Sequence, residues 1–456
     1  MGNNNTAIFA EIPAGWYRSK LGDICERGGG IVQTGPFGSQ LHASDYVSCG
    51  VPSVMPINIC DGHIIEAGIK RVTEKDVNRL ARHQMPAGNI VFARRGDVER
   101  CALVREEQAG WLCGTGCLRL DLGHGVLVPE FAFYYLRHPD VRSWIVAHAV
   151  GSTMPNLNTS IISSLPVIYP KIAEQQAVIG VLRDLDDKIE LNRKMNETLE
   201  ETARAIFRSW FVDFDPVVAK AEGTQPTHMS PETAALFPDS FEESEIGPIP
   251  AGWRIDQIGN AVKCVGGGTP RTTESRYWIG GVHLFATPRD MSRLATPVLL
   301  DTERHITDAG VGKISSGQLP AGTVLLSSRA PIGYLAVAET PVSVNQGIIA
   351  MVCDMELPNS YVLHWTRENM DEILSRAGGT TFAEISKRNF RPVPALIPEK
   401  NPLAHFTSVV EPLHRRIVEN VRESTSLAAI RDTLLPKLTS GEIRLRQAEE
   451  LVEEAL

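Results

Sequence analysis

An internal repeat constrains the fold of this chain more than any other feature of its sequence. The string Ile-Pro-Ala-Gly-Trp at residues 12–16 recurs letter for letter at 249–253, and a glycine triplet follows each copy. Further matches follow in the same order, pairing 88–95 with 322–329 and 165–170 with 393–398. The separation is 237 residues at the first match and 228 at the last. Such a collinear series indicates duplication and predicts two similar domains.

Each copy begins with a segment that mixes strands and helix. Residues 12–170 and 249–398 contain short β-rich runs that are separated by glycine and proline. Each segment also contains a helical stretch, around 129–150 in the first copy and 358–377 in the second. Frequent turns and short strands predict a compact α/β domain in each copy.

Each copy ends in a long helical segment with a heptad seam. From Val178 to Trp210, apolar residues and two asparagines recur at alternating steps of four and three. The second copy has an equivalent seam from Phe406 to Leu438, in which Arg431 interrupts the pattern and Ile430 is expected to face inward instead. Two seams of equal length predict that the helices pair with each other, antiparallel. The seam residues expected to be structural are Leu185, Ile189, Leu199, Leu413, Ile417 and Leu427.

The segment between the copies is rich in proline and has no Lys or Arg after Lys220 until Arg254. This composition predicts an extended, solvated linker. The predicted organisation is a first α/β domain at 1–170, a long helix at 171–215, an acidic linker at 216–247, a second α/β domain at 248–398, and a second long helix with a tail at 399–456.

The net charge of −9 does not exclude nucleic acid as a partner, because the excess acid is unevenly distributed. The blocks 1–170 and 246–398 are close to neutral, and the acidic excess lies outside them. A neutral block can still present one basic face.

The sequence carries no recognisable catalytic constellation. It lacks the phosphate-binding Gly-x-x-x-x-Gly-Lys-Ser/Thr string, a strand-Gly-x-Gly-x-x-Gly-helix unit for a dinucleotide or methyl donor, and a His-x-x-x-His pair. Its eight cysteines include one close pair, Cys113 and Cys117, without a second pair of ligands that zinc would need. We therefore expect no catalytic site, cofactor or metal on this chain.

Polar loops that contain arginine recur at corresponding places in both copies. Arginine can donate two hydrogen bonds to guanine, Gln or Asn can do so with adenine, and hydroxyl groups bind phosphates. Any one such loop is more often an ordinary solvated surface loop. The candidate DNA-contacting residues are Ser39, Gln40, Arg94, Arg95 and Arg100 in the first domain, and Thr269, Arg271, Thr272, Arg329, Asn345 and Gln346 in the second.

Several strings resemble one family, the specificity (S) subunits of type I restriction–modification enzymes. They are the Ile-Pro-x-Gly-Trp opening of each half and the segments 35–41, 92–98, 267–270 with 277–278, and 209–216. The resemblance implies an α+β fold: two similar α/β target-recognition domains separated by a pair of long antiparallel coiled-coil helices, with a pseudo-twofold internal repeat.

The resemblance also implies a non-enzymatic DNA sequence-specificity subunit. Each recognition domain would read one half of a bipartite site in double-stranded DNA, while the helices set the spacing and dock two methyltransferase (M) subunits. Nuclease–translocase (R) subunits would join through the complex. S-adenosylmethionine, ATP and Mg would bind the partner subunits and not this chain. Trp210 and Phe211 are expected to be exposed and to contribute to partner docking.

Two alternatives stay open at this point. One is a self-contained DNA methyltransferase, and the other is a coiled-coil scaffold that does not bind DNA. No apolar run approaches the length needed to cross a bilayer, and residues 1–6 show no secretory signal. These features predict a cytoplasmic protein without a membrane partner.

Overall fold

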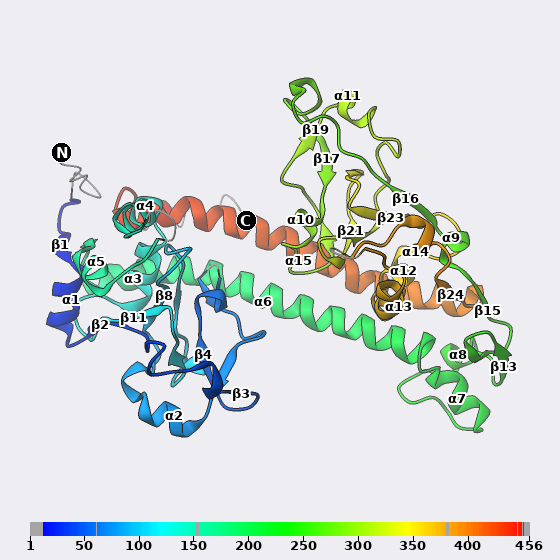
Figure 1. Ribbon diagram of the computed structural model, residues 1–456, viewed down its shortest axis with the longest axis horizontal. Coiled ribbons are helices and arrows are strands. Elements are labelled where there is room, and N and C mark those ends of the chain that lie inside the picture. Colours follow the sequence, from blue (N-terminus) through cyan, green and yellow to red (C-terminus); the bar gives the residue numbers. More distant parts are fainter. Residues whose placement is uncertain are drawn as a thin grey trace. The chain divides into compact units, whose positions relative to one another are not determined.

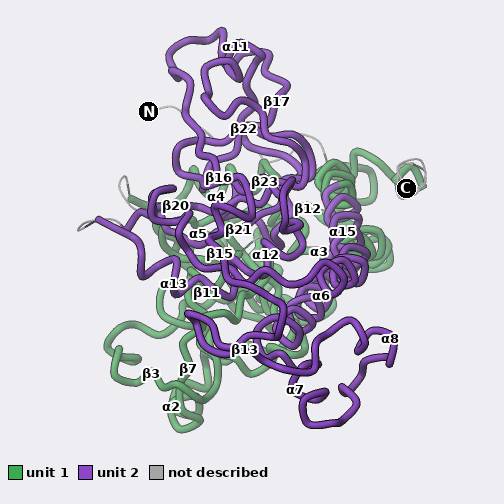
Figure 2. The backbone as a smooth tube through the Cα atoms, turned by 90° about the vertical axis from the view of Figure 1, so that its right-hand side faces the viewer, with its two compact units in different colours: residues 1–188, 426–456 green, residues 189–425 purple. Residues whose placement is uncertain are grey.

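The computed structural model describes residues 12–60, 62–151, 155–379, 383–444, 446–448 and 450. The start of the chain, on which the prediction of no secretory signal was based, lies outside these residues. The chain divides into two compact units, residues 1–188 with 426–456 and residues 189–425 (Figure 2). Two long helices, α6 (Ile172–Phe211) and α15 (Lys400–Ser440), each contribute one part to unit 1 and the other part to unit 2.

The first repeated domain lies in unit 1 and is built on a central sheet of order β2-β11-β8-β9. Figure 1 labels its strands β2, β11 and β8. These strands span Ile31–Thr34, Cys117–Asp121, Ile90–Ala93 and Cys101–Leu103. A further sheet of order β10-β4-β7-β3 spans Leu112–Cys113, Val51–Val54, Lys70–Val72 and Tyr46–Val47. Strand β8 is buried along its whole length, as its continuous apolar run predicts.

Shorter elements complete this domain. A ribbon pairs β1 (Tyr17–Lys20) with β12 (Pro166–Tyr169), so the chain enters and leaves the domain at one place. Strands β5 (Ile59–Cys60) and β6 (His63–Ile64) form a second ribbon. The helices are α1 (Leu21–Gly28), α2 (Glu74–Arg79), α3 (Pro129–Leu136), α4 (Pro139–His148) and α5 (Thr159–Ser164).

The second domain, in unit 2, repeats the main part of this topology. Its central sheet has the order β16-β23-β20-β21-β18, spanning Lys263–Gly266, Ile348–Val352, Val324–Ser328, Ile332–Ala338 and Val298–Leu299. The further sheet has the order β19-β17-β22, spanning His305–Ile306, His283–Ala286 and Val342–Val344. The ribbon pairs β15 (Arg254–Gln257) with β24 (Pro394–Ile397). The helices are α9 (Ile258–Ala261), α10 (Pro288–Met291), α11 (Asp308–Val311), α12 (Asn359–Glu368), α13 (Met370–Ser375) and α14 (Lys387–Phe390).

The two domains correspond in four strands of the central sheet and in one parallel pair of the further sheet. The order β2-β11-β8-β9 in the first domain matches β16-β23-β20-β21 in the second, with antiparallel pairing throughout. The parallel pair of β4 and β10 likewise matches β17 and β22. This correspondence confirms the predicted fold class of two similar α/β domains.

The two long helices pair antiparallel within each unit. In unit 2, the Asn420 side chain donates to Asn196 Oδ1 at 2.8 Å, and Asn192 Nδ2 donates to Glu423 Oε2 at 2.7 Å. In unit 1, Arg431 Nη1 lies 2.8 Å from Asp186 Oδ1. Residue numbers rise on α6 as they fall on α15, which confirms the antiparallel prediction. Buried asparagines at such a seam favour one register over others.

The seam is occupied largely as predicted, apart from Arg431. Leu185, Ile417 and Leu427 are buried, and the remaining predicted seam residues, Ile189, Leu199 and Leu413, are partly buried. Arg431 is itself buried on the seam, so it does not interrupt the seam as expected, and Ile430 beside it is partly buried. The carboxylate of Asp186 supplies a counter-charge, which an isolated buried guanidinium would lack.

The segment expected to be an extended, solvated linker is folded. It forms α7 (Asp215–Ala221), α8 (Pro231–Ala234) and a hairpin of β13 (Phe241–Ser244) with β14 (Gly247–Pro250). Val217 and Phe237 are buried in the same apolar cluster as Trp253. The expectation of an extended segment is therefore wrong, because these apolar residues anchor an acidic, proline-rich stretch.

A search of the described residues for a helix long and apolar enough to span a membrane finds none.

Candidate nucleic-acid interface

The topology of the central sheet brings the predicted loops to one edge. The last residues of β2 and β8, Thr34 and Ala93, pair with Leu118 and Cys117 at the start of β11. Because β2 and β8 both run antiparallel to β11, the loops that follow them emerge at the same edge. In the second domain, β16 and β20 flank β23 in the same way. The predicted contact residues lie in the loops at these edges.

In the first domain, the two loops touch through Arg94 and Phe37. The Arg94 guanidinium lies 5.7 Å from the centre of the Phe37 ring, and its Nε donates to the Leu157 carbonyl at 3.1 Å. Phe37 is 54% exposed. Phe37 is not among the residues predicted from the sequence, because those are polar. The signal that could have identified Phe37 is its place inside a glycine-rich polar loop. An exposed ring beside a guanidinium can stack on a base or a sugar.

The other first-domain candidates differ in whether their side chains are already bonded within the chain. Ser39 and Arg95 are exposed. Gln40 Oε1 accepts a hydrogen bond from the Phe37 amide at 3.2 Å, so this side chain shapes its own loop. Arg100 forms an exposed ion pair with Asp97 at 2.5 Å, which a phosphate could replace at little cost.

In the second domain, Thr269 and Gln346 come together. Thr269 Oγ1 donates to Gln346 Oε1 at 2.7 Å, which joins the loop after β16 to the turn before β23. Arg271 is 83% exposed at its side chain, and its guanidinium lies 3.8 Å from Glu274. Thr272 is also exposed. These residues form a polar surface that can donate and accept hydrogen bonds.

Arg329 and Asn345 line one hollow at the same edge. Arg289 and Tyr334 line it too, and neither was selected from the sequence. Arg289 lies in α10, shortly after the end of β17, and the string Ala-Thr-Pro-Arg at this place was the available signal. Arg329 lies 3.6 Å from Glu384 in a partly exposed ion pair. The hollow offers guanidinium, amide and phenol groups that suit recognition of a base edge.

No group of three or more His, Cys, Asp or Glu side chains that could hold a metal ion occurs among the described residues. Burial raises the pKa of Cys113 to about 12 and that of Cys101 to about 11, so both stay thiols near neutral pH. These thiols have the properties of core residues and not of nucleophiles.

Comparison with known proteins places this architecture in a family. The family model described as "Type I restriction modification DNA specificity domain" matches residues 13–201 and 250–402, one match for each repeated domain. The chain belongs to this family of type I specificity subunits.

Similar proteins agree over nearly the full length. The type I restriction enzyme HindI specificity subunit of Haemophilus influenzae is 26% identical over 86% of this chain and 95% of its own length. The MjaIX specificity subunit of Methanocaldococcus jannaschii is 23% identical over 96% of both chains. The fold is similar to that of the type I S subunit from M. genitalium, with a TM-score of 0.54 and 15% identity over 94% of this chain and 97% of the other.

The expected exposure of Trp210 and Phe211 in this specificity subunit is wrong. They are 8% and 4% exposed and lie in an aromatic cluster at the end of α6. Phe211 packs edge-on against Tyr361 and Phe406, with ring centres 5.1 Å apart in each case. The folded segment after α6 covers Trp210 through Phe237, at 5.2 Å. Buried rings cannot offer an apolar surface to a partner, so these two residues have a core role in the chain.

Proposed function

We propose that each recognition domain reads one half of a bipartite DNA site, and that the paired helices set the gap and dock methyltransferase subunits. One observation carries this proposal: two copies of a single fold present different side chains at the same sheet edge. The loop after β8 carries Arg94, Arg95 and Asp97, whereas the loop after β20 carries Arg329, Ala330 and Pro331. Equivalent surfaces with different donors and acceptors suit two different half-sites.

The helix pair has the properties of a spacer. Asn420 and Asn196 are both buried and bonded to each other, so sliding the helices past one another would leave amide groups without partners. A spacer with one preferred register would give one preferred gap between half-sites.

The catalytic work of the complex would then belong to other subunits. We propose that S-adenosylmethionine, ATP and Mg bind the methyltransferase and nuclease–translocase subunits, and that this chain supplies recognition alone. Added S-adenosylmethionine should leave the melting temperature of the isolated chain unchanged; a rise would favour a self-contained methyltransferase.

The proposal is tested by sequencing methylated adenines in DNA from cells that express this chain with its methyltransferase subunit. Replacing residues 12–170 with the equivalent domain of another specificity subunit should change one half of the methylated site and preserve the other half and the gap. A change in both halves would contradict the proposal. Footprinting of the complex should show two protected half-sites, and uniform or absent protection would favour a scaffold that does not read DNA.

A further inference from the structure

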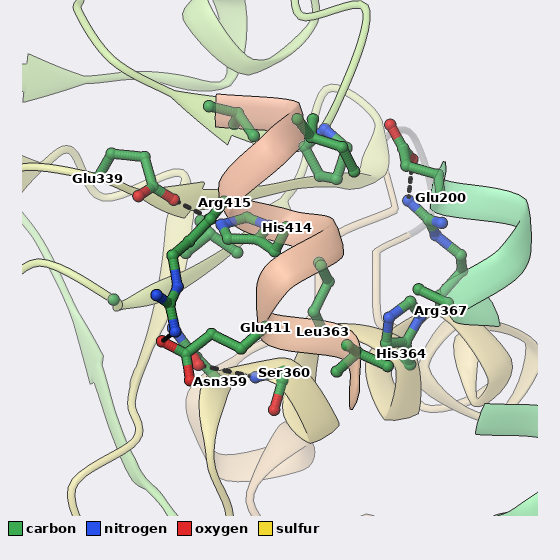
Figure 3. A pocket seen from close by; sticks show the side chains of 17 residues that line it. Glu200, Glu339, Asn359, Ser360, Leu363, His364, Arg367, Glu411, His414 and Arg415 are labelled. Atoms are coloured by element: carbon green, nitrogen blue, oxygen red, sulfur yellow. Dashed lines mark hydrogen bonds and ion pairs between the residues drawn. The ribbon is translucent and has the colours of Figure 1, made fainter. Parts of the chain in front are cut away.

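Two hollows in unit 2 contain charged side chains, and they differ in how firmly these side chains are paired. One is a cavity of about 190 Å³ between the second recognition domain and the long helices (Figure 3). There, His414 Nε2 donates to Glu339 Oε1 at 2.7 Å, and both side chains are largely buried. At the hollow on the sheet edge, Arg289 lies 3.5 Å from Glu303, with side chains 69% and 46% exposed. Solvent weakens such an exposed pair, so Arg289 can exchange Glu303 for another partner.

Arg289 lies in a short turn that follows β17 and begins α10 (Pro288–Met291). The first domain has an equivalent turn after β4, where the 3₁₀ helix η2 (Pro56–Asn58) begins with a proline in the same way. Both strands belong to the parallel pairs that match between the domains, β4 with β10 and β17 with β22. Counted from the two prolines, Arg289 corresponds to Ile57.

The two turns are held by the same hydrogen bond. The amide before each proline donates to the side chain three residues later, from Met55 to Asn58 Oδ1 at 3.0 Å and from Thr287 to Asp290 Oδ2 at 2.9 Å. Both acceptor residues are buried. A buried acceptor and a proline together restrict the conformation of each turn. The exposed residue of each turn is therefore presented from a rigid support.

In the first domain, the turn packs against the segment that bonds to Arg94. A Cβ on Gly116 would lie 3.2 Å from Pro56 Cγ, so the turn contacts the segment that leads into β11. The Gly116 carbonyl accepts a hydrogen bond from the Arg94 amide at 2.9 Å. Ile57 is 84% exposed, more than any other large apolar side chain in the described ranges. An apolar side chain is thus displayed at the edge that carries the predicted contact loops.

The second domain repeats these contacts. A Cβ on Gly347 would lie 3.0 Å from Pro288 Cγ, and the Gly347 carbonyl accepts a hydrogen bond from the Ser328 amide at 2.8 Å. Ser328 precedes Arg329, which lines the hollow together with Arg289. The two domains therefore present one position at the same edge with different chemistry, apolar in the first domain and cationic in the second.

We propose that this shared position determines specificity: Ile57 contacts the methyl group of a thymine in the first half-site, and Arg289 donates to a guanine in the second. In the major groove, thymine presents a methyl group, and guanine presents two acceptors, O6 and N7, that fit a guanidinium. An isoleucine side chain has no hydrogen bond to offer, so its favourable contact with DNA is burial against an apolar group. The inference rests on the proposed function, because each residue is assigned to the half-site of its own domain.

For Ile57 the test is a double-mutant cycle between protein and DNA. The complex of the full chain with its methyltransferase subunits is titrated with duplexes in which one thymine of the first half-site is replaced by uracil, which lacks only the methyl group. At one thymine, this replacement should weaken binding of the natural chain by about fourfold, the effect of one buried methyl group. It should have no effect on Ile57→Ala. Equal uracil effects in both chains at every thymine would overturn the assignment.

Ile31→Ala is the matched control for Ile57. Ile31 is a 49% exposed isoleucine of the same domain, at the start of β2 and so at the opposite end of that strand from the contact loop. This variant should keep the full uracil effect.

For Arg289 the same titration uses duplexes in which one guanine of the second half-site is replaced by 7-deazaguanine, which lacks the N7 acceptor. At one guanine, the replacement should weaken binding of the natural chain by about tenfold, and Arg289→Ala should remove this effect. Arg293→Ala is the matched control, because Arg293 pairs with the same Glu303 at 2.7 Å but is not part of the lining of the hollow. Equal 7-deazaguanine effects in the natural chain and Arg289→Ala would overturn the assignment.

A failure of half-site reading has a different signature from a failure of this assignment. Half-site reading fails if replacement of residues 12–170 changes both halves of the methylated site. This assignment fails if that replacement changes one half as expected, while each altered base has the same effect on the variant and the natural chain. The substituted side chains are exposed, so the variants should melt at the temperature of the natural chain.

Discussion

Replacing Arg431 by leucine should destabilise unit 1 far more than the loss of a surface ion pair. The side chains of Arg431 and Asp186 are 8% and 12% exposed, and their N···O distance is 2.8 Å. Removing one partner of a buried pair costs about 3–5 kcal/mol, because the other charge stays buried. Asp186 would keep its hydrogen bond from Tyr134, and Arg137 lies 3.7 Å away. These contacts offset part of the loss, so we expect about 2–3 kcal/mol.

For a unit of this size, that loss corresponds to a melting temperature lower by roughly 4–12 °C in scanning calorimetry. Arg444→Ala is the control. Arg444 forms a pair of the same length, 2.8 Å, with Glu174, which lies on α6 as Asp186 does, but both partners of this pair are exposed. That control should cost less than about 1 kcal/mol. Equal effects of the two variants would refute the reasoning that burial determines the cost.

Four further predictions follow from the described contacts. Asn420→Leu should cost about 1–3 kcal/mol in chemical denaturation, because it leaves the Asn196 amide unpartnered; adding Asn196→Leu should recover much of the loss. Burial lowers the pKa of His364 to about 3, below its usual 6.5, so protonation of the unfolded chain should reduce stability as the pH falls from 6.5 toward 3. His364→Phe should flatten this decline in pH-dependent melting. Trp210→Ala should lower the melting temperature through a core cavity worth about 3–5 kcal/mol, and a fully stable variant would contradict its core position. Arg94→Ala should weaken DNA binding of the assembled complex by about tenfold or more in a titration and change the first half-site alone, whereas an unchanged affinity would remove Arg94 from the interface.

Several features of the fold could be predicted because their signals are local or repeated. The series of matches that begins with 12–16 and 249–253 and ends with 165–170 and 393–398 predicts two similar domains. This prediction needs no knowledge of how either domain folds. The seam from Val178 to Trp210 predicts a helix face, because helical periodicity is a property of neighbouring residues. The buried strand β8 was visible as a continuous apolar run.

The site was predicted less completely, because its residues come from loops that are distant in sequence. Thr269 and Gln346 were both selected, but their hydrogen bond depends on the pairing of β16 with β23. Arg289 and Tyr334 were missed, because their nearness to Arg329 results from the fold around that hollow.

The amino-acid sequence by itself determined the duplication, the helix seams and the family, since each of these depends on the order and spacing of residue types. The tertiary structure alone decided which residues are buried and which oppose each other. Arg431 could be placed on the seam only once Asp186 was known to face it. Trp210 could be recognised as core only once Phe237, from the segment expected to be a linker, was found packed against it. Burial is a property of what approaches from elsewhere in the chain, and periodicity within one segment does not contain that information.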